Sequence, residues 1–279
     1  MPRIDLESVD LAGVIDIHVH AGPDIRPRKM DVWELVEKAE ENRMEAVFLK
    51  NHYLPTMMEA AIISKKISGI NVYGGLALNY SVGALNAHAV EKAIAMGAKF
   101  IWLPTHDAEN ERAFHNQPGT GIRILDSRSK LKPEVYEVLE LVHGAEMALG
   151  TGHLTYNEIH LLAKECKALK ISRLLINHPG IVFQRFTLQQ QQELVKLGAW
   201  LEHSYCRPPH TLPVDELVET IRRIGHSKII LGTDLGQPQN ADPVDGMKEL
   251  IWQLLANGFL QEDIDIMTKT NPKFMLNSP

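Results

Sequence analysis

The chain has 279 residues, a formal net charge of −6 and an apolar fraction of 44%. This composition is typical of a globular protein with a sizeable core. The negative charge gives no basic footprint for nucleic acid, so we expect no nucleic-acid partner. We expect a single domain over residues 1–279, because no linker, low-complexity stretch or change of composition divides the chain.

The chain carries two cysteines, Cys166 and Cys206, which are too few for a disulfide framework and indicate a reducing compartment. Its N-terminal segment is polar and acidic and lacks the apolar core of a signal peptide. No apolar run approaches the roughly 20 residues of a membrane span. We therefore expect a soluble, cytoplasmic protein with no membrane association.

Short apolar runs alternate with amphipathic helical patterns along the whole chain. The predicted strands cover 14–18, 46–50, 72–78, 100–103, 146–149, 173–177, 199–202 and 228–232. The predicted helices cover 31–42, 56–68, 86–96, 133–143, 156–169, 188–197, 214–224 and 244–257. Eight strand–helix units in unbroken alternation predict an α/β fold, a single (β/α)8 TIM barrel.

Two segments fall outside this alternation. A long connection, 105–132, follows the fourth strand and contains an apolar stretch, 122–125, that suggests a small hairpin. Loops of this length are either binding loops or surface insertions without function, and the sequence does not distinguish the two. A short helix is predicted over 261–268, at the C-terminal end of the barrel.

The motif Asp16-Ile17-His18-Val19-His20 directly follows an apolar run at the first strand. Side chains alternate along a strand, so His18 and His20 are expected to share one face. Two imidazole nitrogens on one face, where a buried strand ends, can bind one metal ion.

Histidines gather at the ends of the predicted strands, where a barrel of this kind places its active site. Windows of about four residues at each end cover roughly a ninth of the chain, so chance predicts one or two of the 13 histidines there. Seven lie there: His18, His20, His52, His106, His153, His178 and His203. The last strand ends in Asp234. We interpret His18, His20, His153, His178 and Asp234 as metal ligands. His52, His106 and His203 are candidates for substrate contact or for capping a strand.

This order of motifs resembles the amidohydrolase superfamily of metal-dependent barrel hydrolases. The resemblance covers nearly the whole chain and is closest to a small, uncharacterised branch. It implies that His18, His20 and Asp234 bind one metal, and that His153 and His178 bind a second metal or that one of them joins the first. Binuclear members carry a bridging carboxylated lysine or a glutamate after strand 4, where this chain has Thr105-His106-Asp107. Lys50 and Glu202 are the alternatives for that bridge.

The ligand types suit Zn²⁺, with Mn²⁺, Fe²⁺, Co²⁺ or Ni²⁺ as alternatives, and one or two ions per chain. Asp234 is the predicted general base for a metal-activated water. His178 or Lys50 would help to polarise the scissile group. Arg26, in the first loop, is a candidate contact for a carboxylate or phosphate, and Glu202 is a further candidate for the substrate site.

The leading functional hypothesis is a metal-dependent hydrolase that cleaves a C–N or C–O bond in a small amide, lactone or ester. A metal-dependent decarboxylase or hydratase on the same barrel is the first alternative, because some relatives use one metal for such lyase chemistry. A phosphoesterase or nuclease is the second. The partner expected in each case is a small-molecule substrate, and the sequence leaves a homo-oligomer possible.

Overall fold

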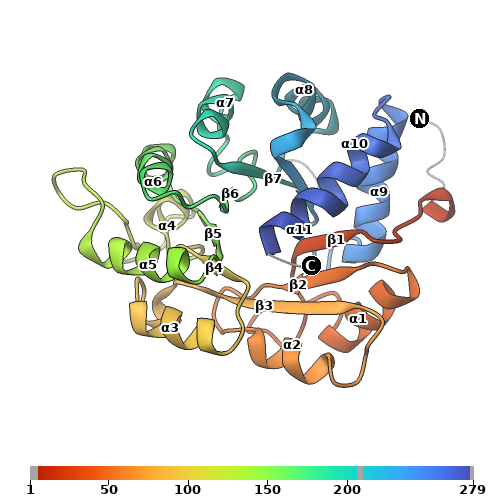
Figure 1. Cartoon of the computed structure of the whole chain (residues 1–279), viewed down its shortest axis with the longest axis horizontal. Helices are drawn as coiled ribbons and strands as arrows, with labels where there is room; N and C mark the ends of the chain where they lie inside the picture. Colours follow the sequence, from red (N-terminus) through yellow and green to blue (C-terminus); the bar gives the residue numbers. More distant parts are fainter. Residues whose placement is uncertain (1–5, 206–209, 277–279) are drawn as a thin grey trace.

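Eight parallel strands form one sheet, with neighbours in the order β1 to β8 (Figure 1). The computed structural model describes residues 6–205 and 210–276. The strands are β1 (Ile15–Val19), β2 (Ala46–Leu49), β3 (Asn71–Ala77), β4 (Phe100–Trp102), β5 (Ala148–Gly150), β6 (Leu174–Ile176), β7 (Trp200–Ser204) and β8 (Ile229–Gly232).

The sheet closes between its first and last strands. Val19 and Leu235 form a parallel bridge, the N–H of His20 donates to the carbonyl of Leu235 at 2.8 Å, and the N–H of Asp234 donates to the carbonyl of His18 at 2.8 Å. The predicted eight-stranded barrel is therefore confirmed. Closure also places the carboxyl ends of β1 and β8, which are more than 200 residues apart in sequence, side by side.

Helices surround the barrel and connect successive strands (Figure 1). They are α1 (Val32–Glu41), α2 (Met57–Ile63), α3 (Ala87–Ala95), α4 (Glu109–Phe114), α5 (Pro133–Gly144), α6 (Tyr156–Ala168), α7 (Leu188–Lys196), α8 (Val214–Ile224), α9 (Pro243–Ala256), α10 (Gln261–Asp265) and α11 (Asn271–Leu276). Local sequence explains several starts, because Asp31, Thr155 and Thr187 each form a capping box with the residue three positions later. None of the helices within the described residues is both long and apolar enough to cross a membrane.

The structure differs from the sequence prediction in three helical segments. The helix predicted over 56–68 ends at Ile63, where the Ser64 hydroxyl donates to the carbonyl of Ala60 at 2.8 Å. The long connection after β4 contains the unpredicted helix α4, and its hairpin-like part is reduced to single bridges such as Leu125–Leu131. The helix predicted over 261–268 is α-helical only in α10 and continues as a π-helical segment, Ile266–Thr270, and the unpredicted helix α11 follows it.

Two apolar clusters hold these layers together. The outer cluster lies between the sheet and the helices and includes Val47, Leu49 and Leu250. The inner cluster fills the barrel and includes Phe48, Phe100, Trp102, Leu175 and Ile230. Met275 and Leu276 of α11 join the inner cluster, and the neighbouring Phe274 ring stacks on Trp200 at the first residue of β7. Helix α11 therefore closes the amino end of the barrel, and the opposite end remains for polar side chains.

Candidate metal centre

A bulge in β1 directs the two histidines of the opening motif into the barrel. Ile15 and Ile17 already belong to the inner cluster, so simple alternation would send His18 toward the helices. Asp16 pairs with Val47 and Val19 pairs with Leu49, however, so β1 advances three residues while β2 advances two. This extra residue shifts the alternation. Val19 then packs in the outer cluster, and His18 and His20 both reach Asp234.

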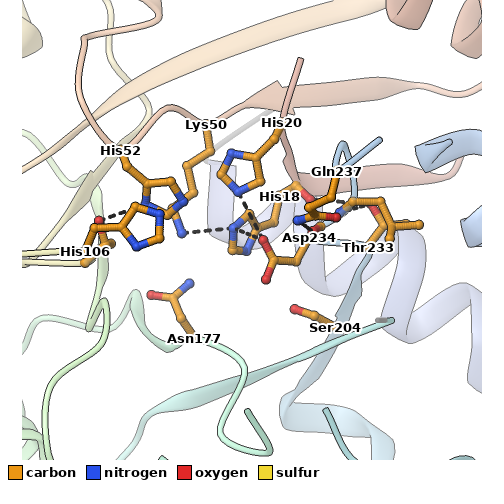
Figure 2. A network of polar contacts seen from close by, with 12 residues as sticks. His18, His20, Lys50, His52, His106, Asn177, Ser204, Thr233, Asp234 and Gln237 are labelled. Carbon is orange, nitrogen blue, oxygen red and sulfur yellow. Dashed lines mark hydrogen bonds and ion pairs between the residues drawn. The ribbon is translucent and has the colours of Figure 1, made fainter. Parts of the chain in front are cut away.

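His18, His20 and Asp234 converge on one point at the carboxyl end of the barrel (Figure 2). Asp234 Oδ1 lies 2.9 Å from His18 Nε2 and 3.0 Å from His20 Nε2. Burial lowers the pKa of His20 to about 3. Burial also opposes the charged form of His18, but the carboxylates of Asp234 and Glu202 raise its pKa to about 9. A buried imidazole that holds a proton between two carboxylates lies where a cation is favoured.

The backbone at Asp234 is strained, and hydrogen bonds from both sides hold it. Asp234 has φ +53°, a conformation that L-residues seldom adopt. Just before it, the Asp16 carboxylate accepts from the Thr233 hydroxyl at 2.6 Å and from the Thr233 N–H at 3.2 Å. Just after it, the Gln237 side-chain amide donates to the Asp234 carbonyl at 2.8 Å. The carboxylate is therefore fixed by its neighbours in sequence as well as by the two imidazoles.

Lys50 follows β2 and reaches the same point. Its Nζ lies 2.9 Å from His18 Nε2 and 5.2 Å from the centre of the Trp102 ring. Burial lowers the pKa of Lys50, although the carboxylates of Asp234, Glu202 and Glu111 oppose that change. His18 Nε2 can either donate to Asp234 or accept from Lys50, and it cannot do both at once.

Glu202 lies beneath His18 inside the barrel and is fully buried. Its Oε1 accepts from His18 Nδ1, and its Oε2 accepts from the Asn177 side-chain amide at 2.6 Å. The Ser204 hydroxyl donates to Oε1 at 3.1 Å. Burial would raise the pKa of Glu202, but His18 lowers it to about 2. Glu202 is not among the residues that line the cavity described below. Its carboxylate therefore orients His18 and does not contact a substrate in that cavity.

A second group of potential ligands forms around Glu111 in α4. Glu111 Oε1 accepts from His106 Nδ1 at 2.7 Å, and Oε2 accepts from His153 Nδ1. Burial would raise the pKa of Glu111, but the His153 and His106 imidazoles hold it far below its usual range. The sequence interpretation missed Glu111, because it searched for an acidic residue at the end of β4 itself. Its only signal was a short run with two glutamates, 109 and 111, in the long connection.

His153 and His178 each carry a buried ring nitrogen without a hydrogen-bond partner, namely Nε2 of His153 and Nδ1 of His178. The two ring centres are 4.9 Å apart, and the His178 ring centre is 5.8 Å from that of His18. Burial lowers the pKa of His153 to about 4 and of His178 to about 3, so both imidazoles are neutral at pH 7. Unpartnered, neutral and buried nitrogens are suited to binding a metal.

All the candidate ligands except His18 line one cavity of about 540 Å³. His52 lines it, donates or accepts at Thr105 Oγ1 (2.9 Å), and lies against His106 with ring centres 3.7 Å apart. Arg26 lines its rim. His203 lies outside this cavity and lines a smaller one that also touches His178. The cavity therefore brings most of the predicted site residues together. The predicted site residues that do not line it are His18, Lys50, Glu202 and His203.

Among the described residues, the chemistry of the first donor set fits a divalent transition metal. Two imidazole nitrogens and one carboxylate oxygen are within 4.8 Å of one another, and His106, Glu111 and His153 meet the same criterion. Nitrogen–oxygen sets of this kind suit Zn²⁺ and its first-row neighbours. In the first set, the Glu202 carboxylate contacts His18 Nδ1. A histidine that binds a metal commonly has such a carboxylate on its other ring nitrogen, which orients the ring.

Sequence comparison gives the family. The family model described as a family of unknown function, DUF6282, matches residues 13–202. The chain belongs to this family. The matched part contains β1 to β6 and most of the candidate ligands, whereas Asp234 lies beyond it. No match was found among curated proteins.

Solved structures similar to this DUF6282 protein are remote in sequence and extensive in coverage. The probable dipeptidase PvdM from Pseudomonas aeruginosa matches with a TM-score of 0.70 at 11% identity, over 98% of this chain and 96% of that one. A zinc-bound amidohydrolase from Burkholderia multivorans matches with a TM-score of 0.62 at 12% identity, over 96% of this chain and 100% of that one. An organophosphorus hydrolase from Deinococcus radiodurans matches with a TM-score of 0.59 at 13% identity, over 96% of this chain and 93% of that one. The predicted resemblance to amidohydrolase barrels is thus confirmed for the fold.

Proposed function

We propose that this protein is a metal-dependent hydrolase that cleaves a C–N or C–O bond in a small molecule such as a cyclic amide, lactone or ester. The observation that carries the proposal is the convergence of His18 Nε2, His20 Nε2 and Asp234 Oδ1 at one point, where His20 and Asp234 line a cavity of small-molecule size. The fold shared with an amidohydrolase that binds zinc supports it. A cavity of about 540 Å³ is consistent with the small-molecule partner expected from the sequence.

We infer that His18, His20 and Asp234 hold one divalent cation, with zinc favoured by the ligand types. His153 and His178, with their unpartnered nitrogens, would hold a second cation or complete the first site. When bound, such a cation supplies a Lewis acid and makes hydroxide accessible near neutral pH. Lys50 is the candidate bridge if it is carboxylated.

The side chains themselves supply the proton transfers and the charge stabilisation. Asp234 is ionised because its pKa lies well below the usual value, and only its Oδ1 faces the two imidazoles. Its second oxygen can take a proton from the attacking water and pass it to the leaving group. The His178 ring and, where its amine is not carboxylated, Lys50 lie beside the same point and would stabilise the negative charge that develops on the attacked oxygen.

One observation keeps a lyase as the second candidate. The β4 end carries Thr105, whose hydroxyl contacts His52 and the Asn79 amide, in place of a bridging lysine or carboxylate. A site without that bridge is suited to a single metal, and a single-metal barrel is compatible with decarboxylation or hydration.

Metal analysis joined to activity screening tests the proposal. The purified protein is analysed for bound metals and assayed on lactones, cyclic amides, esters, phosphodiesters and β-keto acids. We expect at least one zinc per chain and hydrolysis of a lactone, amide or ester. Asp234→Asn should lower kcat/KM by about a thousandfold or more, and His20→Ala should lower both metal content and activity, whereas His88→Ala, at an exposed site on α3, should change neither. A protein that binds no metal, or an Asp234→Asn variant with full activity, would overturn the proposal.

A further inference from the structure

The charged residues that line the cavity divide into two kinds. Asp234 and Glu111 are carboxylates, and each already contacts two imidazoles. Arg26 and Arg28, from the loop between β1 and α1, are the cationic side chains of the lining within the described residues. The two arginines balance the two carboxylates, and the Asp24 carboxylate paired with Arg28 leaves this group of side chains with one net negative charge. One bound divalent cation therefore makes the group net positive. Such a cavity favours an anionic ligand.

Arg28 is held rigidly, with its counter-ion behind it. Its Nε and Nη2 donate to Asp24 Oδ2 at 2.7 and 2.5 Å, and the Asp24 side chain is only 1% exposed. Arg28 lines the cavity and Asp24 does not. Nη2 also lies 3.5 Å from His20 Nδ1, so the guanidinium stands directly beside the candidate metal ligands. A guanidinium already fixed in place loses little conformational entropy when it binds an anion.

Arg26 and an amide-rich loop complete this polar side. Arg26 donates from Nε to the Tyr53 hydroxyl at 3.1 Å and lies at the exposed rim. The loop after β8 contributes Gln237, Gln239 and Asn240 to the lining. The N–H of Lys29 donates to the carbonyl of Gly236 at 2.7 Å, which joins the two loops. The arginines and the amides therefore occupy one connected side of the cavity.

The loop after β6 gives the cavity an apolar wall. Ile181 and Phe183 are the large apolar side chains of the lining, and the Phe183 ring centre lies 4.9 Å from that of His153. A ligand near the histidines thus meets an aromatic ring on this wall and guanidinium groups on the loop after β1. The volume, about 540 Å³, accommodates a molecule of one or two rings.

We propose that the substrate is a small carboxylic acid with an apolar, ring-sized body. This inference rests on the proposed function and names its substrate class. Arg28 and Arg26 bind the carboxylate, because the planar guanidinium matches a carboxylate with two parallel hydrogen bonds. Ile181 and Phe183 pack against the body. The scissile bond then lies between them, over Asp234.

Calorimetric titration with three matched probes tests the proposal without a known substrate. The probes are benzoate, neutral benzamide and phenyl phosphate, each titrated into the zinc-loaded protein and into the metal-free protein. We expect benzoate to bind about tenfold or more tighter than benzamide, in line with hydrogen bonds to a charged group. The preference should be smaller without metal but should remain, because the arginines contribute to it directly.

Four variants assign the contacts. Arg26→Gln should weaken benzoate binding about threefold, as for an exposed charge. The double variant Asp24→Asn/Arg28→Gln removes the buried pair together, so no buried charge is left alone, and should abolish most of the benzoate preference. Phe183→Ala should weaken the binding of benzoate and of benzamide alike, by about tenfold. Lys29→Gln makes the same charge change in the same loop at an exposed residue outside the cavity lining, and should leave all affinities unchanged.

Three results would overturn the proposal. The first is equal affinity for benzoate and benzamide. The second is a benzoate preference that disappears with the metal and is insensitive to both arginine changes, which would assign the carboxylate to the metal alone. The third is phenyl phosphate binding more than about tenfold tighter than benzoate, which would make the ligand a phosphate. None of these affects the proposed hydrolase activity, which is judged separately by zinc content and by hydrolysis of neutral lactones.

Discussion

Glu202 and His18 form a buried pair inside the barrel, in which the Glu202 carboxylate accepts from His18 Nδ1 and leaves His18 Nε2 directed at Asp234. The same arrangement recurs on the other side of the cavity, where Glu111 accepts from His153 Nδ1 and leaves His153 Nε2 without a partner. Each carboxylate occupies Nδ1 of a histidine and leaves its Nε2 for another contact. The orientations of His18 and His153 thus depend on these two carboxylates.

Glu202→Gln should weaken zinc binding by about ten- to a hundredfold, because an amide no longer holds His18 in one orientation and tautomer. Competition with a chromophoric chelator measures this affinity. Glu193→Gln provides the control, since Glu193 accepts from the Tyr156 hydroxyl at 2.6 Å, far from the cavity lining. Unchanged zinc affinity in Glu202→Gln would show that His18 needs no such partner.

Glu111→Gln should lower metal content and activity and cost about 1–3 kcal/mol of stability, because one amide cannot accept from both His106 and His153. Equilibrium dialysis with zinc and urea unfolding measure the two effects. Glu109→Gln on the same helix is the matched control, since Glu109 forms only an exposed ion pair with Arg123 at 3.0 Å. If both variants lost the same amount of bound zinc and of stability, the contacts of Glu111 with His106 and His153 would have no special role.

Gly236→Ala should destabilise the protein by more than about 2 kcal/mol. A Cβ at this position would lie 1.9 Å from the His20 carbonyl oxygen, and the backbone has φ +138°. Gly258→Ala serves as the control for backbone strain alone, because Gly258 has φ +85° and no atom within 4 Å of the added Cβ. It should lose only about 1 kcal/mol. Urea unfolding curves measure the free energy of unfolding of both variants. An equal loss of stability in the two would contradict the close approach of the loop to His20.

Lys38→Met should lower stability by about 0.5 kcal/mol at neutral pH. Lys38 Nζ lies 2.8 Å from Asp242 and 2.9 Å from Asp245, and so joins α1 to α9. Burial raises the pKa of Asp242, but its hydrogen bonds from Lys38 and from the Asp245 backbone outweigh this and lower it. A carboxyl with a lowered pKa in the folded state stabilises it above the unfolded pKa, near 3.8, and loses this contribution as the pH falls further. The difference between wild type and variant should therefore shrink below about pH 4 in acid unfolding, and a constant difference would refute the pairing.

Most of the fold was predictable from the sequence, because it depends on local patterns. Apolar runs and their spacing are properties of neighbouring residues, and they predicted the eight strands within a few residues. Histidines at the strand ends could be predicted in the same way. Once the strands form a parallel barrel, all their carboxyl ends meet, so His18, His52, His153 and Asp234 had to approach one another.

The tertiary structure decided what the sequence left open. The extra residue in β1 comes from pairing with β2 and is invisible to a rule of simple alternation. Glu111 joins His153 across 42 residues, and Glu202 joins His18 across 184. No local pattern encodes which carboxylate meets which ring nitrogen, because that depends on barrel closure and on the fold of the loop that contains α4. The sequence by itself determined that a set of candidate metal-binding side chains would gather at one end of a barrel. Only the packed structure determined which of them face the cavity and which hold the others in place.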